Sequence, residues 1–320
     1  VLDNVVIDVP SESQVHKQVI RKRAEVRDIT MNPSTKLFYV EVQEPDMHDP
    51  SGDLERLVSA LKIEWDLQEL TANLDILKIL QKTLRKGDWK VTCAVYLGDN
   101  VFPPRIVKMW PGFYEGSIFG LAVDIGSTTI AAHLCDLRNG DVLTSSGVMN
   151  PQIRYGEDLM SRVSYSMMNE NGADEMTIAV REGLNELFLN ICNDTDIQLD
   201  LILEAVFVCN PVMHHLLLGI DPYELGQAPF ALASSNSQVF KASELGLKIN
   251  PSGHIYFLPC IAGHVGADSA AVALSEQPGK SKELLLVVDV GTNAEILLGN
   301  VDRVYACSSP TGPAFEGAQI

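Results

Sequence analysis

Two short segments of this sequence share one plan: an apolar run ends in Asp-x-Gly-[Ser/Thr], and a second apolar run follows. The first is FGLAVDIGSTTI at residues 119–130, and the second is LLLVVDVGTNAEILL at residues 284–298. Apolar runs on both sides of a glycine turn predict two β-hairpins. One such hairpin is common, but the pair predicts a duplicated fold with a site shared between its halves.

The first turn has the composition of a phosphate-binding loop. Gly126 lets the backbone turn and lets its N–H approach an anion closely. The hydroxyl groups of Ser127, Thr128 and Thr129 can donate hydrogen bonds to phosphate oxygens. The carboxylate of Asp124 repels phosphate, so its expected role is to bind Mg²⁺ or the water around that ion.

The second turn offers the same groups from the other half of the chain. Asp289 is the expected Mg²⁺ ligand and a catalytic residue. Gly291, Thr292 and Asn293 are expected to bind phosphate. Glu295 adds a carboxylate that could orient an attacking water. Each turn alone is also compatible with a plain hairpin whose Asp caps the turn, but two copies favour the shared site.

From residue 118 onward, strand and helix patterns alternate, and this predicts an α/β fold with a mixed sheet. The strands are expected at 119–124, 128–136, 142–148, 203–209, 254–261 and in the second hairpin, and the helices near 156–170, 174–192, 211–218 and 265–276.

Residues 1–117 differ from the rest and predict a small α+β module. Leu54, Leu57, Val58 and Leu61 lie on one face of a helix. A proline-rich loop at residues 99–117 marks the expected domain boundary. No cluster of acids, histidines or nucleophiles in this region points to catalysis, so a linking or association role is expected.

The bulk composition excludes several functions. A net charge of −18 argues against a nucleic-acid surface, and no apolar run is long enough to cross a bilayer. No basic segment followed by an apolar one opens the chain, so export is unsupported and a cytoplasmic location is expected. The six cysteines form no Cys-x-x-Cys pair, so no zinc or iron–sulfur site is expected within the chain.

The two hairpins resemble the phosphate-1 and phosphate-2 motifs of the acetate and sugar kinase/Hsp70/actin superfamily, which clamps ATP and Mg²⁺ between two lobes. Six segments also resemble one family in it, the reductive activators of corrinoid-dependent enzymes. These are GLAVDIGSTTIAAHLCDL, RYGEDLMSRV, NPVMHHLLLGIDPYELGQAPF, LPCIAGHVGADSAAVAL, VVDVGTNAEILLG and CSSPTGPAFEGAQI. The resemblance covers residues 118–320 densely and residues 1–117 more weakly.

The resemblance implies a two-lobed ATPase domain at 118–320 and a linker and middle domain at 1–117, through which a homodimer would form. It implies ATP hydrolysis that drives reduction of Co(II) to Co(I) on a corrinoid protein of a methyltransferase system. A [2Fe-2S] ferredoxin domain would precede the linker, and its cysteines are absent from this sequence. The adenosine-binding end of the ATPase domain is also expected outside the sequence, so the chain resembles an internal piece of a longer protein.

Several further residues have weaker signals. Arg154, Asp158 and Arg162 have helical spacing, which fits either ion pairs along one helix or a nucleotide-sensing position in the cleft. His214 and His215 precede an apolar run, so one is expected to be buried and hydrogen-bonded rather than a metal ligand. The last residues, SSPTGPAFEGAQI, predict a loop entering a helix, in which Gly312 could bind an anion, and Asp268 could face the Mg²⁺ site.

Three alternatives remain open from the residues. A sugar or carboxylate kinase shares the hairpins but needs a substrate pocket with a basic carboxylate, and no such motif stands out. An activator of 2-hydroxyacyl-CoA dehydratases needs cysteines for a [4Fe-4S] cluster, and only Cys307 has a comparable position. A regulatory or assembly module of the actin type would use ATP only as a conformational latch.

Overall fold

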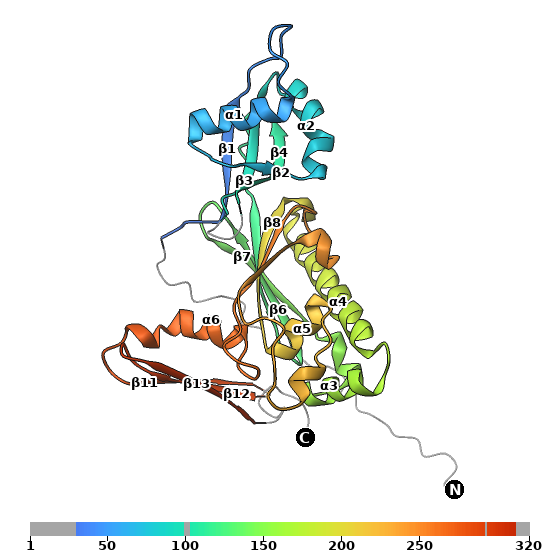
Figure 1. Ribbon diagram of the computed structural model, residues 1–320, viewed down its shortest axis with the longest axis vertical. Helices are drawn as coiled ribbons and strands as arrows, with labels where there is room; N and C mark the ends of the chain where they lie inside the picture. Colours follow the sequence, from blue (N-terminus) through green and yellow to red (C-terminus); the bar gives the residue numbers. More distant parts are fainter. Residues whose placement is uncertain (1–29, 99–102, 292, 312–320) are drawn as a thin grey trace.

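The computed structural model describes residues 30–98, 103–291 and 293–311. Over these residues the chain forms three β-sheets with helices packed on them. Figure 1 shows the N-terminal unit at the top, a large central sheet with its helices below it, and a third sheet to one side.

The first sheet has four strands in the order β1-β3-β4-β2, covered by two helices. Leu57 and Leu61 of α1 are fully buried against this sheet, as the helical spacing of the leucines predicts. The second helix begins where the Asn73 side chain accepts the backbone N–H of Ile76 (3.1 Å), and it ends at Gly87. The elements are β1 (Thr35–Glu41), α1 (Asp53–Trp65), β2 (Thr71–Ala72), α2 (Leu74–Lys86), β3 (Lys90–Tyr96) and β4 (Arg105–Pro111).

The second sheet has six strands in the order β7-β6-β5-β8-β10-β9. The strands β5, β8 and β10 are parallel to one another, and the other pairs are antiparallel, so the predicted mixed sheet is confirmed. The short strand β9 was not anticipated. The strands are β5 (Phe119–Ile125), β6 (Thr129–Asp136), β7 (Val142–Met149), β8 (Ile202–Cys209), β9 (Gln238–Lys241) and β10 (His254–Phe257).

Three helices cover one face of this sheet and form the largest hydrophobic core with it. The longest, α4, lies along the sheet, and its residues Leu184, Leu187 and Phe188 are fully buried. The helices are α3 (Leu159–Met168), α4 (Gly172–Thr195) and α5 (Pro211–Leu218). Short 3-10 turns span Pro151–Tyr155, Leu199–Leu201, Tyr223–Gly226, Ala242–Leu245 and Pro278–Lys280.

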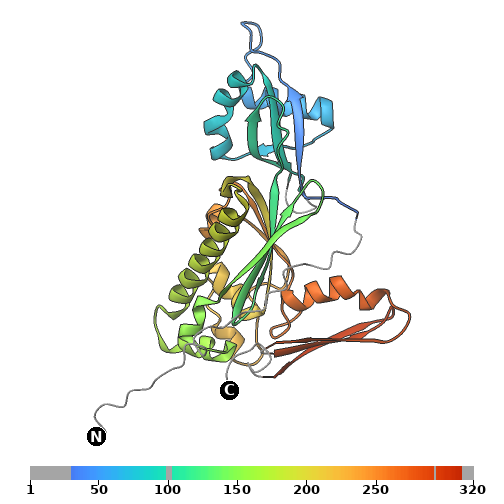
Figure 2. The ribbon, with the colours of Figure 1, turned by 180° about the vertical axis from the view of Figure 1, so that it is seen from behind.

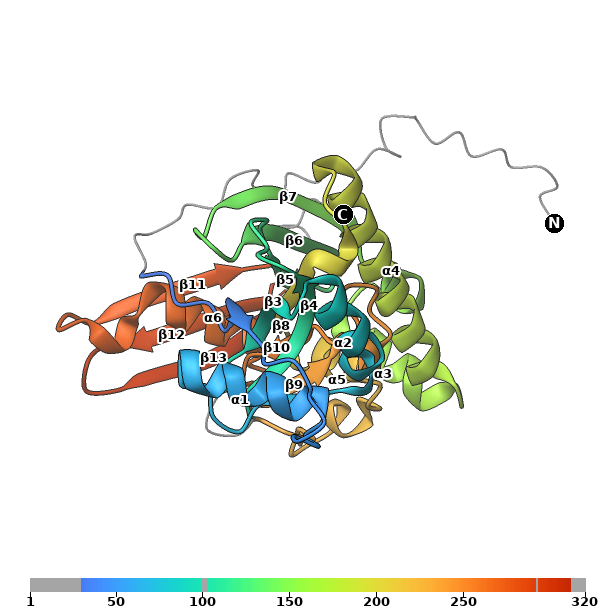
Figure 3. The same ribbon diagram turned by 90° about the horizontal axis from the view of Figure 1, so that it is seen from above.

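The third sheet has three antiparallel strands in the order β11-β12-β13 and is reached through helix α6. This unit lies on the opposite side of the central sheet from α4 in all three ribbon views (Figures 1, 2 and 3). Residues 308–310 belong to β13, so the expectation of a loop is wrong for them; residues 312–320 lie outside the described residues. The elements are α6 (Ala267–Glu276), β11 (Leu285–Val290), β12 (Asn293–Gly299) and β13 (Val304–Pro310).

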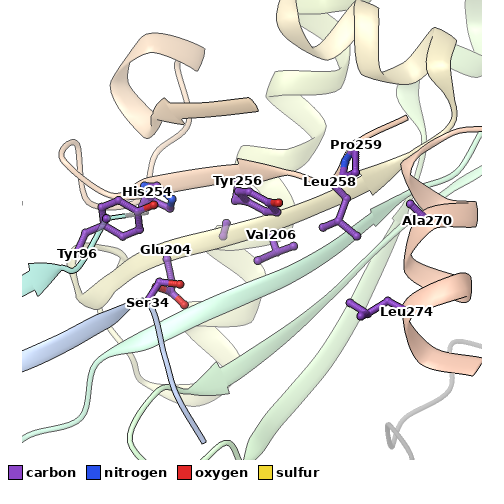
Figure 4. A pocket seen from close by; sticks show the side chains of 12 residues that line it. Ser34, Tyr96, Glu204, Val206, His254, Tyr256, Leu258, Pro259, Ala270 and Leu274 are labelled. Carbon is purple, nitrogen blue, oxygen red and sulfur yellow. The ribbon is translucent and has the colours of Figure 1, made fainter. Parts of the chain in front are cut away.

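The first sheet is joined to the central one by polar and aromatic contacts. The Thr35 hydroxyl donates to a carboxylate oxygen of Glu204 (2.8 Å), and the rings of Tyr96 and His254 stack at 3.7 Å. Burial raises the pKa of Glu204. Glu204, Tyr96 and His254 line a cavity of about 560 Å³, in which Ala270 and Leu274 of α6 face the central sheet (Figure 4).

Both predicted hairpins are present. Asp124 of β5 pairs with Ala131 of β6, and Asp289 of β11 pairs with Glu295 of β12. The loop expected at residues 99–117 is wrong for Arg105–Pro111, which form strand β4 and pair with β3. The expected domain boundary after residue 117 falls between β4 and β5 and stays a prediction. Within the described part of the chain, no helix has the length and apolarity that a membrane span requires.

Candidate functional site

The first hairpin turn is tight, and its geometry explains the glycine. The N–H of Gly126 donates to the carbonyl of Thr129 at 2.9 Å. A Cβ atom at position 126 would lie 2.8 Å from the same carbonyl oxygen, which is closer than real Cβ contacts. Glycine is therefore needed here for close approach. Ser127 is buried, whereas Thr128 and Thr129 are half-buried.

The second hairpin turn is also closed by a bond from its glycine N–H, but the acceptor is two residues ahead instead of three. The N–H of Gly291 donates to the carbonyl of Asn293 at 2.8 Å, and the hydroxyl of Thr311 donates to the carbonyl of Gly291. Thr292 and Gly312, which were predicted to bind ATP, lie outside the described residues. The phosphate-binding roles of both turns remain predictions.

Acidic and hydroxyl side chains form a row across the third sheet. Asp289 stands opposite Glu295 in the β11–β12 ladder, and Glu295 stands opposite Ser308 in the β12–β13 ladder. Residues directly opposite one another share a face of the sheet. The Ser308 hydroxyl donates to the Glu295 carboxylate at 3.2 Å. The sequence did not point to Ser308, because the strand that carries it was expected to be a loop.

Helix α6 brings a third acid to this region. A Cβ atom at Gly266, just before the helix, would lie 2.5 Å from the carbonyl oxygen of Cys209 at the end of β8. The missing side chain therefore lets the start of α6 touch the central sheet. Asp268 in the first turn of α6 is held by the backbone N–H of Ser269 (2.7 Å).

Asp268, Asp289 and Glu295 act on one another electrostatically, and both Asp124 and Asp268 act on the Cys209 thiol at the end of β8. Burial, and then the charge of Asp268, raises the pKa of Glu295 to about 7, and Asp289 adds to this shift. Burial and the charge of Asp289 raise the pKa of Asp268. The pKa of the Cys209 thiol is raised by burial and by the charges of Asp268 and Asp124. The acids of both hairpins thus lie around the start of α6.

This donor set fits a magnesium ion, which prefers carboxylate and water oxygens. Repulsion among Asp268, Asp289 and Glu295 is a cost that a divalent cation would offset. Among the described residues, no three His, Cys, Asp or Glu side chains are already close enough to hold a metal ion together. Water molecules would therefore have to complete the shell of an ion held by Asp124 and Asp289.

A cavity of about 520 Å³ separates the third sheet from the helical side of the molecule. Asn293 and Ser308 line it from the third sheet, and Asp158 and Val212 line it from the starts of α3 and α5. The predicted phosphate-2 residue Asn293 therefore faces a cleft between the two halves of the fold.

The residues Arg154, Asp158 and Arg162 do not form ion pairs along one helix, so that interpretation is wrong. Arg154 lies in a 3-10 turn, and Asp158 caps α3 by accepting the backbone N–H of Ser161 at 2.8 Å. Arg162 is fully buried and donates to the carbonyl of Ser127 in the first hairpin turn.

His214 and His215 are both buried in α5. His215 donates through Nδ1 to the carbonyl of Pro211 (2.9 Å) and accepts the N–H of Ala233 at Nε2 (3.1 Å). This confirms a buried, hydrogen-bonded histidine in its neutral form. Burial and the neighbouring His215 lower the pKa of His214 to about 4.

The central mixed sheet, the two Asp-Gly hairpins and the helix that joins them define a domain of the acetate and sugar kinase/Hsp70/actin (ASKHA) fold, preceded by a small α+β unit. Family models match three consecutive parts of the chain. They are described as the RACo linker region (residues 24–116), the RACo middle region (119–279) and the C-terminal domain of RACo, the ASKHA domain (283–320). The chain belongs to the RACo family.

Two similar proteins and one solved structure support the assignment of the chain to this family. The corrinoid activation enzyme RamQ of Eubacterium limosum is 34% identical over 262 residues, which cover 78% of this chain and 44% of that protein. A [Co(II) methylated amine-specific corrinoid protein] reductase of Methanosarcina barkeri is 29% identical over 213 residues, which cover 63% of this chain and 38% of that protein. The solved structure of a reductive activator for corrinoid,iron-sulfur protein matches with a TM-score of 0.83 and 33% identity, covering 92% of this chain and 46% of that one. This chain therefore spans less than half the length of these relatives.

Proposed function

We propose that this chain is the nucleotide-binding part of an ATP-dependent reductive activator of a corrinoid protein. The observation that carries the proposal is the grouping of Asp268, Asp289 and Glu295 at the start of α6, where Asp124 of the first hairpin also acts on Cys209. The names of the relatives support the corrinoid protein as the partner.

In the proposed mechanism, the two turns bind the phosphates of ATP from opposite sides. The backbone N–H groups and hydroxyls of Ser127, Thr128 and Thr129 bind one side, and the Gly291–Asn293 turn binds the other. Asp124 and Asp289 hold the cation and its water shell. A bound Mg²⁺ supplies neutralisation of the phosphate charge.

Glu295 orients the attacking water and accepts its proton. A pKa of about 7 matches this task, because a base with a pKa near the working pH is both available and strong enough. Ser308 holds one oxygen of the Glu295 carboxylate and so fixes its direction. Asp268, half-buried beside Asp289 and Glu295, adds a third carboxylate on the side where the cation would be held.

Hydrolysis would be coupled to one-electron reduction of the partner. Closure of the two halves on Mg²⁺–ATP would provide the free energy for transfer of one electron to Co(II), which gives Co(I). The electron would come from a [2Fe-2S] ferredoxin domain outside this chain. We further propose that the protein acts in the cytoplasm, serves a methyltransferase system, and dimerises through residues 1–117.

The experiment uses the chain extended to the length of its relatives, called here the completed protein. ATP hydrolysis is measured with Mg²⁺ in the presence of a Co(II) corrinoid protein or a panel of sugars and carboxylates, and Co(I) is followed by its absorbance. We expect stimulation by the corrinoid protein and formation of Co(I) only when ATP is present. Phosphorylation of a sugar or carboxylate, without formation of Co(I), would overturn the proposal in favour of a kinase.

A further inference from the structure

We infer that Arg162 and Asn150 are positioning residues, which set the first hairpin turn in the orientation that binds phosphate. This inference rests on the proposed nucleotide function and names two residues that act through the turn rather than on the nucleotide. Both side chains are fully buried.

Three consecutive carbonyl groups of the turn are held from one side. The carbonyl of Gly126 accepts the Asn150 side-chain amide (2.8 Å), and the carbonyl of Thr128 accepts the Asn150 backbone N–H (2.8 Å). Between them, the carbonyl of Ser127 accepts a hydrogen bond from the Arg162 guanidinium. Each peptide unit of the turn is therefore fixed by a separate bond.

The fixed carbonyls determine where the neighbouring N–H groups point. In a planar trans peptide the C=O and the following N–H point in opposite directions. The N–H groups of Ser127, Thr128 and Thr129 are thus turned away from Asn150 and Arg162. Successive N–H groups that converge on one side form a concave anion site. The buried cation of Arg162 behind the turn adds a favourable field for phosphate.

The two positioning residues are themselves held in place. Arg162 donates through Nε to the carbonyl of Gly156 (2.9 Å) and through a terminal nitrogen to Gln152 Oε1 (3.4 Å). Gln152 in turn donates to the carbonyl of Met176 in α4 (2.8 Å), and its own N–H is bound by the Asn150 side chain (3.0 Å). The turn is therefore connected to the longest helix of the core through one hydrogen-bond network.

Arginine is required because its planar fork reaches several acceptors at once. A lysine keeps the charge but has a single ammonium group, which cannot reach the carbonyls of both Ser127 and Gly156 in the same geometry. A methionine removes both the charge and the donors at similar volume. The pair Arg162→Lys and Arg162→Met thus separates the contribution of the charge from that of the fork.

The test is done in the completed protein by calorimetric titration with ATP and with adenosine. For Arg162→Met we expect about a tenfold or greater loss of ATP affinity, because one charged hydrogen bond and the turn geometry are lost. Adenosine affinity should change less than about twofold, since the turn binds only phosphate. Arg162→Lys should recover part of the ATP affinity. These differences between ligands would not follow from a purely structural role.

The matched control is Arg181→Met. Arg181 also donates to a backbone carbonyl, that of Leu217 at the end of α5 (3.0 and 2.8 Å), in the same core. We expect it to lower both affinities equally or not at all. A second variant, Asn150→Ser, keeps an oxygen that can accept the Gln152 N–H but replaces the amide that donates to Gly126 with a shorter hydroxyl, which cannot make both bonds in the same geometry.

The outcomes test the proposed nucleotide function and the positioning role of Arg162 and Asn150 separately. If the unmodified completed protein fails to bind ATP, the proposed function is wrong. If it binds ATP, the folded Arg162→Met variant tests the positioning role. That role is wrong if the variant keeps its full affinity for ATP, or if its affinities for ATP and adenosine fall by the same factor. If circular dichroism shows that Arg162→Met is unfolded, Asn150→Ser decides by the same ratio of ATP to adenosine affinity.

Discussion

The two hairpins carry the same sequence plan but have different surroundings. In the β5–β6 hairpin, Ile125 and Ile130 beside the turn are fully buried between the helices and the neighbouring strands. In the β11–β12 hairpin, Val288 and Val290 before the turn keep 47% and 48% of their surface exposed. Within the described residues, the first motif is thus enclosed by the central sheet and its helices, whereas the second contacts its own sheet, α6 and the Pro278–Lys280 turn.

The difference indicates a division of labour. The first turn has its three carbonyls fixed by buried side chains and brings one acid, Asp124. The second brings Asp289 and, across the ladder, Glu295, whose pKa of about 7 shows an environment that opposes its charge. We therefore expect the first hairpin to hold phosphate in place and the second to bring the groups for chemistry.

The largest effect is expected from Asp289→Asn in the completed protein. The amide has no charge with which to hold Mg²⁺, and loss of several kcal/mol of charge stabilisation corresponds to a drop in ATP turnover of about 10³-fold. Formation of Co(I) on the corrinoid partner should stop as well. Asp302→Asn, an exposed acid on the β12–β13 loop, is the control and should retain turnover. Normal turnover in Asp289→Asn would remove the second hairpin from the site.

Glu295→Gln tests whether the second hairpin supplies the base. Turnover should fall by about 10²-fold, which is the usual contribution of a general base. ATP affinity should be retained, because the base acts in the chemical step and not in binding. In the unmodified protein the rate should rise with pH as Glu295 loses its proton, at a pH below 7 because bound Mg²⁺ favours the charged carboxylate, and in the variant this rise should disappear. Steady-state rates between pH 5.5 and 8.5 provide the check. An unchanged pH profile in the variant would assign the base elsewhere.

Gly126→Ala tests the rigidity of the first hairpin. The new methyl group would lie 2.8 Å from the Thr129 carbonyl, so the turn must open and its N–H groups must move. We expect ATP affinity to fall by about tenfold, whereas turnover at saturation changes less. In Gly279→Ala the methyl group meets only Val304 at 3.6 Å, an ordinary contact, so this control should bind ATP normally. Equal affinities in the two variants would contradict a phosphate-binding turn.

The sequence was most informative where the pattern is local. Both hairpins and the helices around them follow from short-range periodicity, as in the β5–β6 pair. The partners of the first turn could not be found this way, since Arg162 and Asn150 lie 35 and 24 residues from the carbonyls that they bind. The helical interpretation of Arg154–Arg162 failed because Gly156 is extended and Asp158 starts a new helix. Strand β13 was missed because its Ser-Ser-Pro end has the composition of a loop.

The smallest expected effect is on stability, and it tests whether the surroundings of Glu295 in the second hairpin oppose its charge. The pKa of Glu295 is raised from an ordinary 4.5 to about 7, so between these values the folded chain binds more protons than the unfolded one. The free energy of unfolding therefore falls as the pH rises across this window, and it levels off above about 7. In Glu295→Gln this loss is absent, so its melting temperature relative to the unmodified chain should increase from pH 5 to pH 8. Calorimetry of both chains without Mg²⁺ measures this difference, and Glu186→Gln, an exposed glutamate on α4, is the control and should show no trend. If this difference in melting temperature stays constant with pH, the environment of Glu295 does not oppose its charge. The electrostatic reason for a cation at the second hairpin would then be removed.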